Sequence, residues 1–391
     1  MDDLCPACSM SDAVSFFSVD GVPTSSCVLL EDEQEARSCP RGRIELAVCR
    51  ACGFITNRAF EPSLTEYSSR YEETQAFSPT FVEFAKALAK QWVDRYNLHG
   101  ARILEIGCGK GEFLVWMLEA GAGSATGIDP GVRPERLDTE LAGRIEWIAD
   151  LYDDRWLDLE ADAIVCRHTL EHIHAVGDFL RRIRSHTDAR DIPILFEVPD
   201  ARRVLDEGAF WDVYYEHCSY FTAGSLARLF RRCGFEVLDV ALAYDDQYLL
   251  LEARPTGVSA TPAPLPIEEQ ADSVLEIATR FATRHDEMIT RLSTRFDDVR
   301  ARGGRTVLWG GSSKAVGLLS VPSVLDGLTA VVDVNPHKQG RYLAGTGHQI
   351  VAPEALPLLR PDLIVVANPV YLAEIRRQVR EMDIECEVTA L

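Results

Sequence analysis

The sequence has few basic residues for its length. Its 391 residues include 40 Lys and Arg against 61 Asp and Glu, which gives a formal net charge of −21 at pH 7. A surface of that sign repels polyanions, so we expect neither a nucleic-acid partner nor an anionic membrane partner. A chain of this length has room for about two or three domains with sizeable cores.

Long apolar runs are also missing. No window approaches the ~20 apolar residues that a membrane-spanning helix needs. The N-terminal residues Met-Asp-Asp-Leu-Cys lack the basic and apolar regions of a secretion signal. We therefore expect a cytoplasmic protein, in which the 11 cysteines are metal ligands or ordinary buried thiols rather than disulfides.

The dinucleotide fingerprint Gly-x-Gly-x-x-Gly is absent where it would be expected. An apolar strand pattern at 103–106 runs into Gly-Cys-Gly-Lys-Gly at 107–111, and a helical pattern follows at 113–117. Glycines on alternate positions permit a tight turn and bring backbone N–H groups against a ligand. The next strand ends at Asp129, whose carboxylate would meet the hydroxyls of a ribose. An ordinary turn without a ligand is the alternative interpretation.

This stretch resembles the first motif of class I S-adenosylmethionine-dependent methyltransferases. The resemblance rests on four residues of the strand and loop, Glu105, Gly107, Gly109 and Gly111, and on an acid 18 positions beyond Gly111, which is Asp129. It implies that the loop holds the amino-acid part of S-adenosylmethionine and that Asp129 holds its ribose.

Residues after the third and fourth strand patterns extend the same cofactor site. Asp150 and Leu151 follow a strand pattern at 145–149, where the family has an acid for the adenine amino group and an apolar residue on the ring. Arg167 and His168 follow a strand pattern at 161–166, next to the transferred methyl group. We assign all four residues to the cofactor site.

Two Cys-x-x-Cys pairs lie in the N-terminal segment: Cys5, Cys8, Cys49 and Cys52. Each pair can present two thiolates to one ion, and two pairs complete a closed, structural zinc site. The interval 9–48 is longer than usual finger spacing, so we expect a pair of hairpins there. It also contains Cys27 and Cys39, which could compete as ligands. A redox pair is the alternative for a single motif of this kind.

The remaining patterns predict an α/β protein: a class I methyltransferase Rossmann-like sheet with an N-terminal zinc-binding lobe and a second, smaller C-terminal α/β domain. The expected units are a zinc-binding lobe at 1–70, a methyltransferase domain at 71–255, a linker with a long helix at 256–302, and a Rossmann-like substrate-binding domain at 303–391. A helix is predicted at 80–97, further strands at 192–199, 235–243 and 248–253, and another helix at 226–234. The long helix, from 267 to about 302, serves as a strut or meets a partner subunit.

The C-terminal unit has no NTPase loop, because Gly-x-x-x-x-Gly-Lys-Ser/Thr is not found. A strand at 306–309 instead runs into a turn of glycine, hydroxyl and lysine residues, which at a helix N-terminus suits an anion. Expected contacts to a substrate diphosphate are Gly311, Ser312, Ser313, Lys314 and Lys338. A plain βα turn is the alternative.

A loop at 210–221 gathers aromatic residues around one carboxylate and one imidazole. Together with the paired cysteines and the C-terminal unit, it resembles the sugar C-methyltransferases of antibiotic deoxysugar biosynthesis, which methylate C3 of nucleotide-linked 4-keto-deoxysugars. The resemblance implies that a base removes the proton next to the ketone and that the enolate attacks the sulfonium methyl. An aromatic lid with a surface His–Glu pair is the alternative for this loop.

The family motif Tyr-x-Glu-His implies individual roles. It makes His217 the general base, Glu216 a sugar-binding or orienting group, and Tyr214 a donor to the enolate. His172 matches a family histidine after the fourth strand, and Tyr71 a tyrosine ahead of the core. Fixed phenols and imidazoles suit such an anion, because they donate where its charge develops.

Two residues depart from the family pattern. His168 stands where members commonly have Asn, and Glu171 where they have a small or polar residue. The Leu-Glu-His-Ile form at 170–173 is widespread among methyltransferases of many substrates. An O- or N-methyltransferase of another small-molecule or sugar acceptor is therefore the alternative function.

Overall fold

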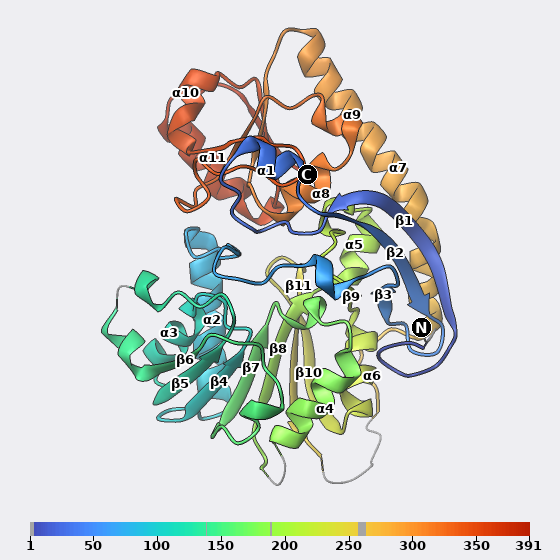
Figure 1. Cartoon of the computed structure of the whole chain (residues 1–391), viewed down its shortest axis with the longest axis vertical. Coiled ribbons are helices and arrows are strands. Elements are labelled where there is room, and N and C mark those ends of the chain that lie inside the picture. Colours follow the sequence, from blue (N-terminus) through green and yellow to red (C-terminus); the bar gives the residue numbers. More distant parts are fainter. Residues whose placement is uncertain (1–3, 138, 188–189, 257–262) are drawn as a thin grey trace.

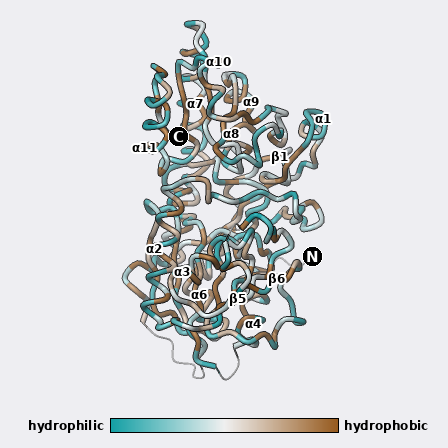
Figure 2. The backbone as a smooth tube through the Cα atoms, turned by 90° about the vertical axis from the view of Figure 1, so that its left-hand side faces the viewer, coloured by the Kyte–Doolittle hydropathy of each residue, from teal (hydrophilic) through white to brown (hydrophobic). Residues whose placement is uncertain are grey.

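The structure is a computed structural model of the whole chain, and it describes residues 4–137, 139–187, 190–256 and 263–391. The strands of these residues form three sheets (Figure 1). A seven-stranded sheet lies at one end of the molecule, a five-stranded sheet at the other, and a four-stranded sheet beside the junction. The side view shows the same stacking, with α2, α3 and α6 in one half and α8 to α11 in the other (Figure 2).

The seven-stranded sheet has the order β10-β11-β8-β7-β4-β5-β6. Its strands are β4 (Arg102–Ile106), β5 (Ser124–Ile128), β6 (Ile145–Ile148), β7 (Ala163–Arg167), β8 (Ile194–Pro199), β10 (Phe235–Ala243) and β11 (Tyr248–Pro255). The five strands from β8 to β6 are parallel, and β11 lies antiparallel between β8 and β10. The predicted α/β fold is confirmed, and β8 begins one residue after Pro193 because proline cannot donate to the ladder.

Five helices accompany this sheet: α2 (Pro79–Arg95), α3 (Glu112–Glu119), α4 (Val176–His186), α5 (Ala201–Glu207) and α6 (Ala223–Arg232). Two of them begin earlier than their apolar spacing predicts. The Ser78 side chain caps α2 ahead of Pro79, and Thr222 forms a capping box with Ser225 at the start of α6. Capping groups fix these helix starts, and apolar periodicity does not report them.

The N-terminal sheet has the order β1-β2-β3-β9, with antiparallel neighbours. Its strands are β1 (Ala13–Pro23), β2 (Arg41–Cys49), β3 (Ile55–Asn57) and β9 (Ser219–Tyr220). The prediction of two hairpins between the cysteine pairs is wrong: β1 and β2 form one long pair, and their connection contains the short helix α1 (Glu33–Arg37). The fourth strand comes from the aromatic loop, so this sheet is completed by a distant segment.

The C-terminal sheet is parallel throughout, in the order β14-β13-β12-β15-β16. Its strands are β12 (Thr306–Trp309), β13 (Ala330–Val332), β14 (Ile350–Val351), β15 (Leu363–Val366) and β16 (Glu387–Ala390). Its helices are α8 (Ser313–Leu319), α9 (Pro322–Leu325), α10 (Leu356–Leu359) and α11 (Leu372–Glu381). Strand β14 went unpredicted because two residues are too few to show a periodic pattern.

The long helix α7 (Ala271–Ala301) runs down one side of the molecule, next to β1, β2, α5 and α9 (Figure 1). Phe281 and Phe296 are fully buried and share one core with Ile44 of β2 and Leu308 of β12. Burying these apolar side chains ties the N-terminal sheet to the C-terminal unit, as the strut interpretation expects. Of the linker expected between residue 256 and the helix predicted from 267, residues 257–262 lie outside the described residues. Among the described helices, none has the length and apolar character needed to cross a membrane.

Candidate active site

A cavity of about 740 Å³ lies between the carboxyl edge of the seven-stranded sheet and the C-terminal unit. It brings together most of the residues predicted for the cofactor, the substrate and the chemistry, from segments that are far apart in the sequence. Three predicted residues are not part of its wall: Gly111, Glu216 and Gly311. Gly111 begins α3 below the loop, and the other two lie behind the cavity wall.

The glycine loop leaves β4 and turns into α3. Gly107 and Gly109 have φ values of +72° and +55°, in the left-handed region that favours glycine. A Cβ on Gly107 would stand 1.9 Å from the Thr169 hydroxyl, and one on Gly109 would stand 2.5 Å from a carboxylate oxygen of Glu73. The loop is therefore a side-chain-free cradle at the cavity wall, and these residues fit the amino-acid part of S-adenosylmethionine.

Two acids border the cavity at the ends of β5 and β6. Asp129 accepts hydrogen bonds from the N–H groups of Gly109 at 3.1 Å and Gly131 at 2.6 Å, and burial raises the pKa of its carboxyl. Asp150 accepts the N–H of Leu151 at 2.8 Å and pairs with Arg155. The Leu151 side chain is 62% exposed, so it offers apolar surface at the rim.

A buried charge cluster forms the floor of the cavity, around the carboxyl end of β7. Arg167 Nε donates to Glu197 at 2.5 Å, and His168 lies 3.2 Å from Glu197 and 3.5 Å from Glu171. Burial lowers the pKa of His168, but the two carboxylates outweigh it and raise that pKa to about 9. Burial also raises the pKa of Glu105, to about 8. His168 is therefore a cation at neutral pH, held by Glu197, a residue that sequence reasoning missed.

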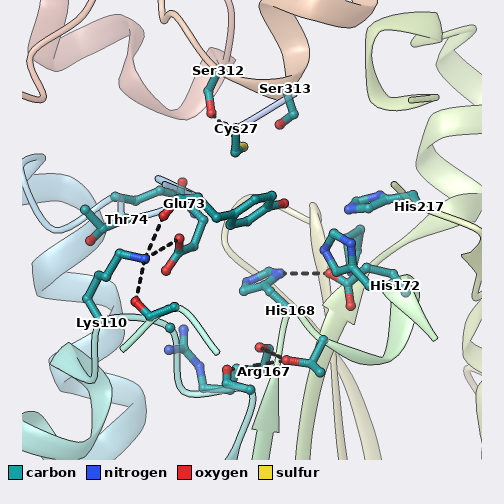
Figure 3. A pocket seen from close by; sticks show the side chains of 18 of the residues that line it. Cys27, Glu73, Thr74, Lys110, Arg167, His168, His172, His217, Ser312 and Ser313 are labelled. Carbon is teal, nitrogen blue, oxygen red and sulfur yellow. Dashed lines mark hydrogen bonds and ion pairs between the residues drawn. The ribbon is translucent and has the colours of Figure 1, made fainter. Parts of the chain in front are cut away.

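His172 and His217 lie across the cavity from Lys110 of the glycine loop (Figure 3), and a tyrosine hydroxyl contacts each of them. The Tyr214 hydroxyl is 2.8 Å from His217 Nε2, and the Tyr67 hydroxyl is 3.0 Å from His172 Nδ1. The two imidazole rings meet edge to face at 4.8 Å. Burial lowers the pKa of His217 well below its usual range, and the nearby His172 adds to the effect. His217 is thus neutral at pH 7 and able to accept a proton.

Glu216 supports this cluster from behind. It is 1% exposed and accepts hydrogen bonds from the backbone N–H of Ser26, at 2.9 Å, and from the Ser26 hydroxyl. Burial raises the pKa of its carboxyl to about 7, and a hydrogen bond with Tyr71 opposes that rise. Ser26 comes from the connection between β1 and β2, and no sequence motif indicated its role.

The turn after β12 is less cationic than its sequence indicates. Lys314 forms a short ion pair with Asp212, and Lys338 lies 3.9 Å from Asp333. The Gly311 N–H donates to Asp333 at 2.8 Å, so it is also occupied. The Ser312 hydroxyl faces the Cys27 thiol at 3.4 Å, while Ser313 lines the cavity. An anion at this turn would have to replace these carboxylate contacts.

The four N-terminal cysteines form a separate, buried cluster. The Sγ atoms of Cys5 and Cys52 are 3.7 Å apart, and those of Cys8 and Cys49 are 3.5 Å apart. Thiolates bound at ~2.3 Å around a tetrahedral zinc ion have similar separations, so this donor set fits the ion. Cys27 lines the active-site cavity instead and is not a member of this cluster.

Comparisons with known proteins agree with this architecture. Residues 81–240 match the family model of a methyltransferase domain, and residues 264–385 match that of a C-methyltransferase C-terminal domain. The chain is 27% identical over 389 residues to C-methyltransferase NovU of Streptomyces niveus. This match covers 95% of this chain and 91% of that protein. A shorter stretch, 22% of the chain, is 32% identical to the mitochondrial ubiquinone biosynthesis O-methyltransferase of Schizosaccharomyces pombe, covering 34% of it.

Among solved structures, a similar chain is the 1,6-didemethyltoxoflavin-N1-methyltransferase of Burkholderia thailandensis with bound 1,6-didemethyltoxoflavin and S-adenosylhomocysteine. It is 22% identical with a TM-score of 0.35, and the match covers 46% of this chain and 81% of that one. The relationship is therefore carried by the two family models and the full-length relative. These matches indicate that the chain is an S-adenosylmethionine-dependent methyltransferase, with a C-terminal part similar to that of C-methyltransferases.

Proposed function

We propose that the enzyme methylates a carbon atom of a nucleotide-linked keto-deoxysugar, by deprotonation next to the ketone. The observation that carries the proposal is His217, a buried and neutral imidazole bonded to Tyr214 and facing the cavity that the glycine loop borders. Removing a proton from the carbon next to a ketone needs such a base. A loop that served only as an aromatic lid would not need one. The bound cofactor supplies an electrophilic methyl group.

In this proposal His217 takes the proton from the carbon next to the ketone, and the electron pair of the broken C–H bond moves into the enolate. Burial in a low-dielectric wall lowers the pKa of His217, so the free base is ready at neutral pH. The proton then rests on the imidazole, whose Nε2 remains bonded to the Tyr214 hydroxyl. Bound S-adenosylmethionine would supply the methyl group to the enolate carbon: as the C–C bond formed, the methyl–sulfur bond would break and its electron pair would leave with S-adenosylhomocysteine.

The charge that develops on the ketone oxygen needs fixed donors. Burial raises the pKa of Tyr214 well above its usual value, so this phenol keeps its proton and can donate. His172, whose pKa is lowered by burial, is positioned by Tyr67 on the same wall. Glu216 lies behind the cavity wall, so its proposed orienting role acts on the sugar through Tyr71, to which it is hydrogen-bonded.

We further propose that the C-terminal turn, with Ser312, Ser313, Lys314 and Lys338, receives the diphosphate of the substrate. Ser312 and Ser313 of this turn line the same cavity as His172 and His217 (Figure 3). Phosphate oxygens would pair with Lys314 and Lys338 in place of Asp212 and Asp333, the carboxylates that these lysines contact in the structure. In functional terms, residues 71–255 would hold the cofactor and residues 303–391 the nucleotide end of the substrate.

Hydrogen exchange tests the proposed base. With a nucleotide-linked keto sugar in D₂O, we expect the wild type to incorporate deuterium at the carbon next to the ketone, and His217→Ala to lose both exchange and methylation. His174→Ala is a matched control, since His174 stacks on Phe60 outside the cavity. If His217→Ala keeps its activity, the base assignment is wrong.

O- or N-methylation of another acceptor is the second candidate, and His168 favours it. This imidazolium, held by Glu197 and Glu171, places a positive charge where the family commonly has Asn. An acceptor with its own nucleophilic oxygen or nitrogen needs positioning more than a base. Under this alternative, no solvent deuterium enters the substrate and His217→Ala loses only a modest part of the rate.

We also propose that Cys5, Cys8, Cys49 and Cys52 bind a structural zinc ion. Four thiolates leave no open position for catalysis, and their sulfur separations suit tetrahedral coordination. Elemental analysis should find about one zinc ion per chain, lost in Cys49→Ser together with thermal stability. Cys386→Ser, at a partly buried thiol of the C-terminal unit, should retain both. A metal-free wild type of unchanged stability in the presence of a chelator would contradict the proposal.

A further inference from the structure

Residues 66–78 form a strap that runs from the N-terminal sheet to α2 and borders the cavity, from Tyr67 beside His172 to Glu73 over the glycine loop. This strap lies outside the segment that matches the methyltransferase family model, which begins at residue 81. Its backbone is tied down from several directions: Arg133 donates to the carbonyl of Ser69, and Lys110 to that of Tyr71. The strap is therefore held against the cofactor half of the cavity by side chains of that half.

Glu73 of this strap reaches directly over the glycine loop. One of its carboxylate oxygens, Oε1, stands 2.5 Å from the position that a Cβ on Gly109 would occupy. The other, Oε2, accepts a hydrogen bond from Lys110 Nζ at 3.1 Å (Figure 3). One oxygen is thus fixed by a lysine, and the other faces the middle of the cradle.

Lys110 is the anchor of this arrangement. Its side chain is 1% exposed, and Nζ donates to the carbonyls of Tyr71 at 2.7 Å and Gly131 at 3.0 Å as well as to Glu73. An ammonium has three N–H donors, so all of them are used. Lys110 therefore has no donor left for a ligand, and its role is to hold Glu73 and the strap in place.

Carboxyl groups are in excess over cations around the cradle. Glu73 lies near Asp129, and Glu105 and Glu112 line the same cavity. The cations there are Lys110, which contacts Glu73, and Arg167, which acts on Glu105. Burial and the charge of Asp129 raise the pKa of the Glu73 carboxyl to about 7, despite Lys110. A ligand cation next to Glu73 would relieve this excess, and S-adenosylmethionine carries an ammonium on its amino-acid part.

We propose that Glu73 accepts a hydrogen bond from the α-ammonium of S-adenosylmethionine, so that the strap is part of the cofactor site. The glycine loop supplies the cradle for the amino-acid part, and Glu73 stands over its middle glycine as the acceptor that this loop lacks. Because Tyr71 of the same strap adjoins Glu216, cofactor binding and the acceptor wall are joined by one short segment. The proposal concerns the cofactor alone and stands whatever the methyl acceptor is.

Calorimetric titration of the full chain with three ligands tests this proposal. S-adenosylmethionine and S-adenosylhomocysteine carry the α-ammonium, and 5′-methylthioadenosine lacks the whole amino-acid part. We expect Glu73→Gln to weaken the first two by about 10- to 100-fold, as for a charged hydrogen bond, and to leave the third unchanged. Glu66→Gln is the matched control, because Glu66 lies in the same strap, bonds Ser68 and does not line the cavity.

The outcomes separate binding from folding. An equal loss for all three ligands would mean that Glu73 only supports the cavity, and would overturn the proposal, as would no loss for any. A second variant, Lys110→Met, should also weaken the two amino-acid ligands selectively, because it releases Glu73. The double variant should then lose little more than either single one. Additive losses would show that Lys110 and Glu73 act separately, against the anchor role.

Discussion

The two sides of the cavity are built in different ways. The proposed cofactor side rests on one continuous stretch, β4, the glycine loop and α3, with acids at the ends of the neighbouring strands. The proposed acceptor side is assembled from separate segments that contribute Ser26, Tyr67, His172, Tyr214 and Ser312. A local motif can be shared by many methyltransferases, whereas an assembled wall can change its acceptor by changing any one segment.

The largest effect is expected for His217→Ala, which should reduce turnover without changing the affinity for the cofactor. Because His217 is the proposed base and does not contact the glycine loop, His217→Ala should reduce turnover by about 10²- to 10⁴-fold. The dissociation constant for S-adenosylmethionine should stay within about twofold of the wild type. Steady-state kinetics and calorimetry on the same preparation measure the two numbers. A parallel loss of cofactor affinity would show that the cavity does not divide in this way.

A substitution on the cofactor side should do the reverse. Gly107→Ala adds a Cβ 1.9 Å from the Thr169 hydroxyl in a residue with φ +72°, so the loop must shift. We expect a loss of cofactor affinity of about 100-fold, measured by calorimetry. Gly100→Ala is a matched control, because Gly100 has φ +75° but no atom within 4 Å of the added carbon.

The control separates strain from contact. Gly100→Ala should lower the free energy of unfolding by about 1 kcal/mol through backbone strain alone and leave cofactor affinity intact. If Gly107→Ala binds S-adenosylmethionine like the wild type, the glycine loop is not the cradle. Chemical denaturation would then show a lower free energy of unfolding in both variants, while the affinity for S-adenosylmethionine stayed unchanged in both.

A smaller effect is expected at Ser26, where the acceptor wall depends on a distant segment. Ser26→Ala removes the hydroxyl that hydrogen-bonds Glu216 but keeps the backbone N–H bond of 2.9 Å. Losing a donor to the carboxylate raises the pKa of Glu216 further above about 7. We expect about a 10-fold lower kcat/KM for the acceptor, with the acidic limb of the pH profile moved to higher pH. Ser25→Ala, one residue earlier, should behave as the wild type, and an identical loss there would point to loop disruption.

The same comparison explains what could be predicted from the sequence. The alternation of strands and helices, the glycine loop and Asp129 are local in the chain, so spacing together with the resemblance to class I methyltransferases indicated the fold and the cofactor side. Ser26 and Asp212 carry no motif, because their roles depend on a residue far away in the sequence: Glu216 for Ser26 and Lys314 for Asp212. Charge on the C-terminal turn was overestimated for the same reason, since the sequence does not reveal which carboxylate neutralises a lysine.

Glu73 shows how the two kinds of construction meet, since it comes from a distant strap and yet serves the cradle of the local motif. Its pKa of about 7 results from burial and from Asp129, opposed by Lys110, so the carboxyl gains a proton as the pH falls below 7. The protonated form cannot pair with an ammonium, which itself stays charged below its ordinary pKa of about 8. Affinity for S-adenosylmethionine should therefore fall by about tenfold between pH 7 and about pH 5.5.

Calorimetry over this pH range checks the prediction, with Glu73→Gln as the comparison because it cannot titrate. The variant should bind weakly at both pH values, with a much flatter profile than the wild type. Asp129, Glu105 and Glu112 line the same cavity, and burial also raises their pKa values, so an unchanged pH profile in Glu73→Gln would assign the titration to one of these carboxyls. In that case the proposed cofactor side would not depend on the strap. It would be built only from β4, the glycine loop, α3 and the ends of the neighbouring strands, whereas the proposed acceptor wall needs segments from across the chain.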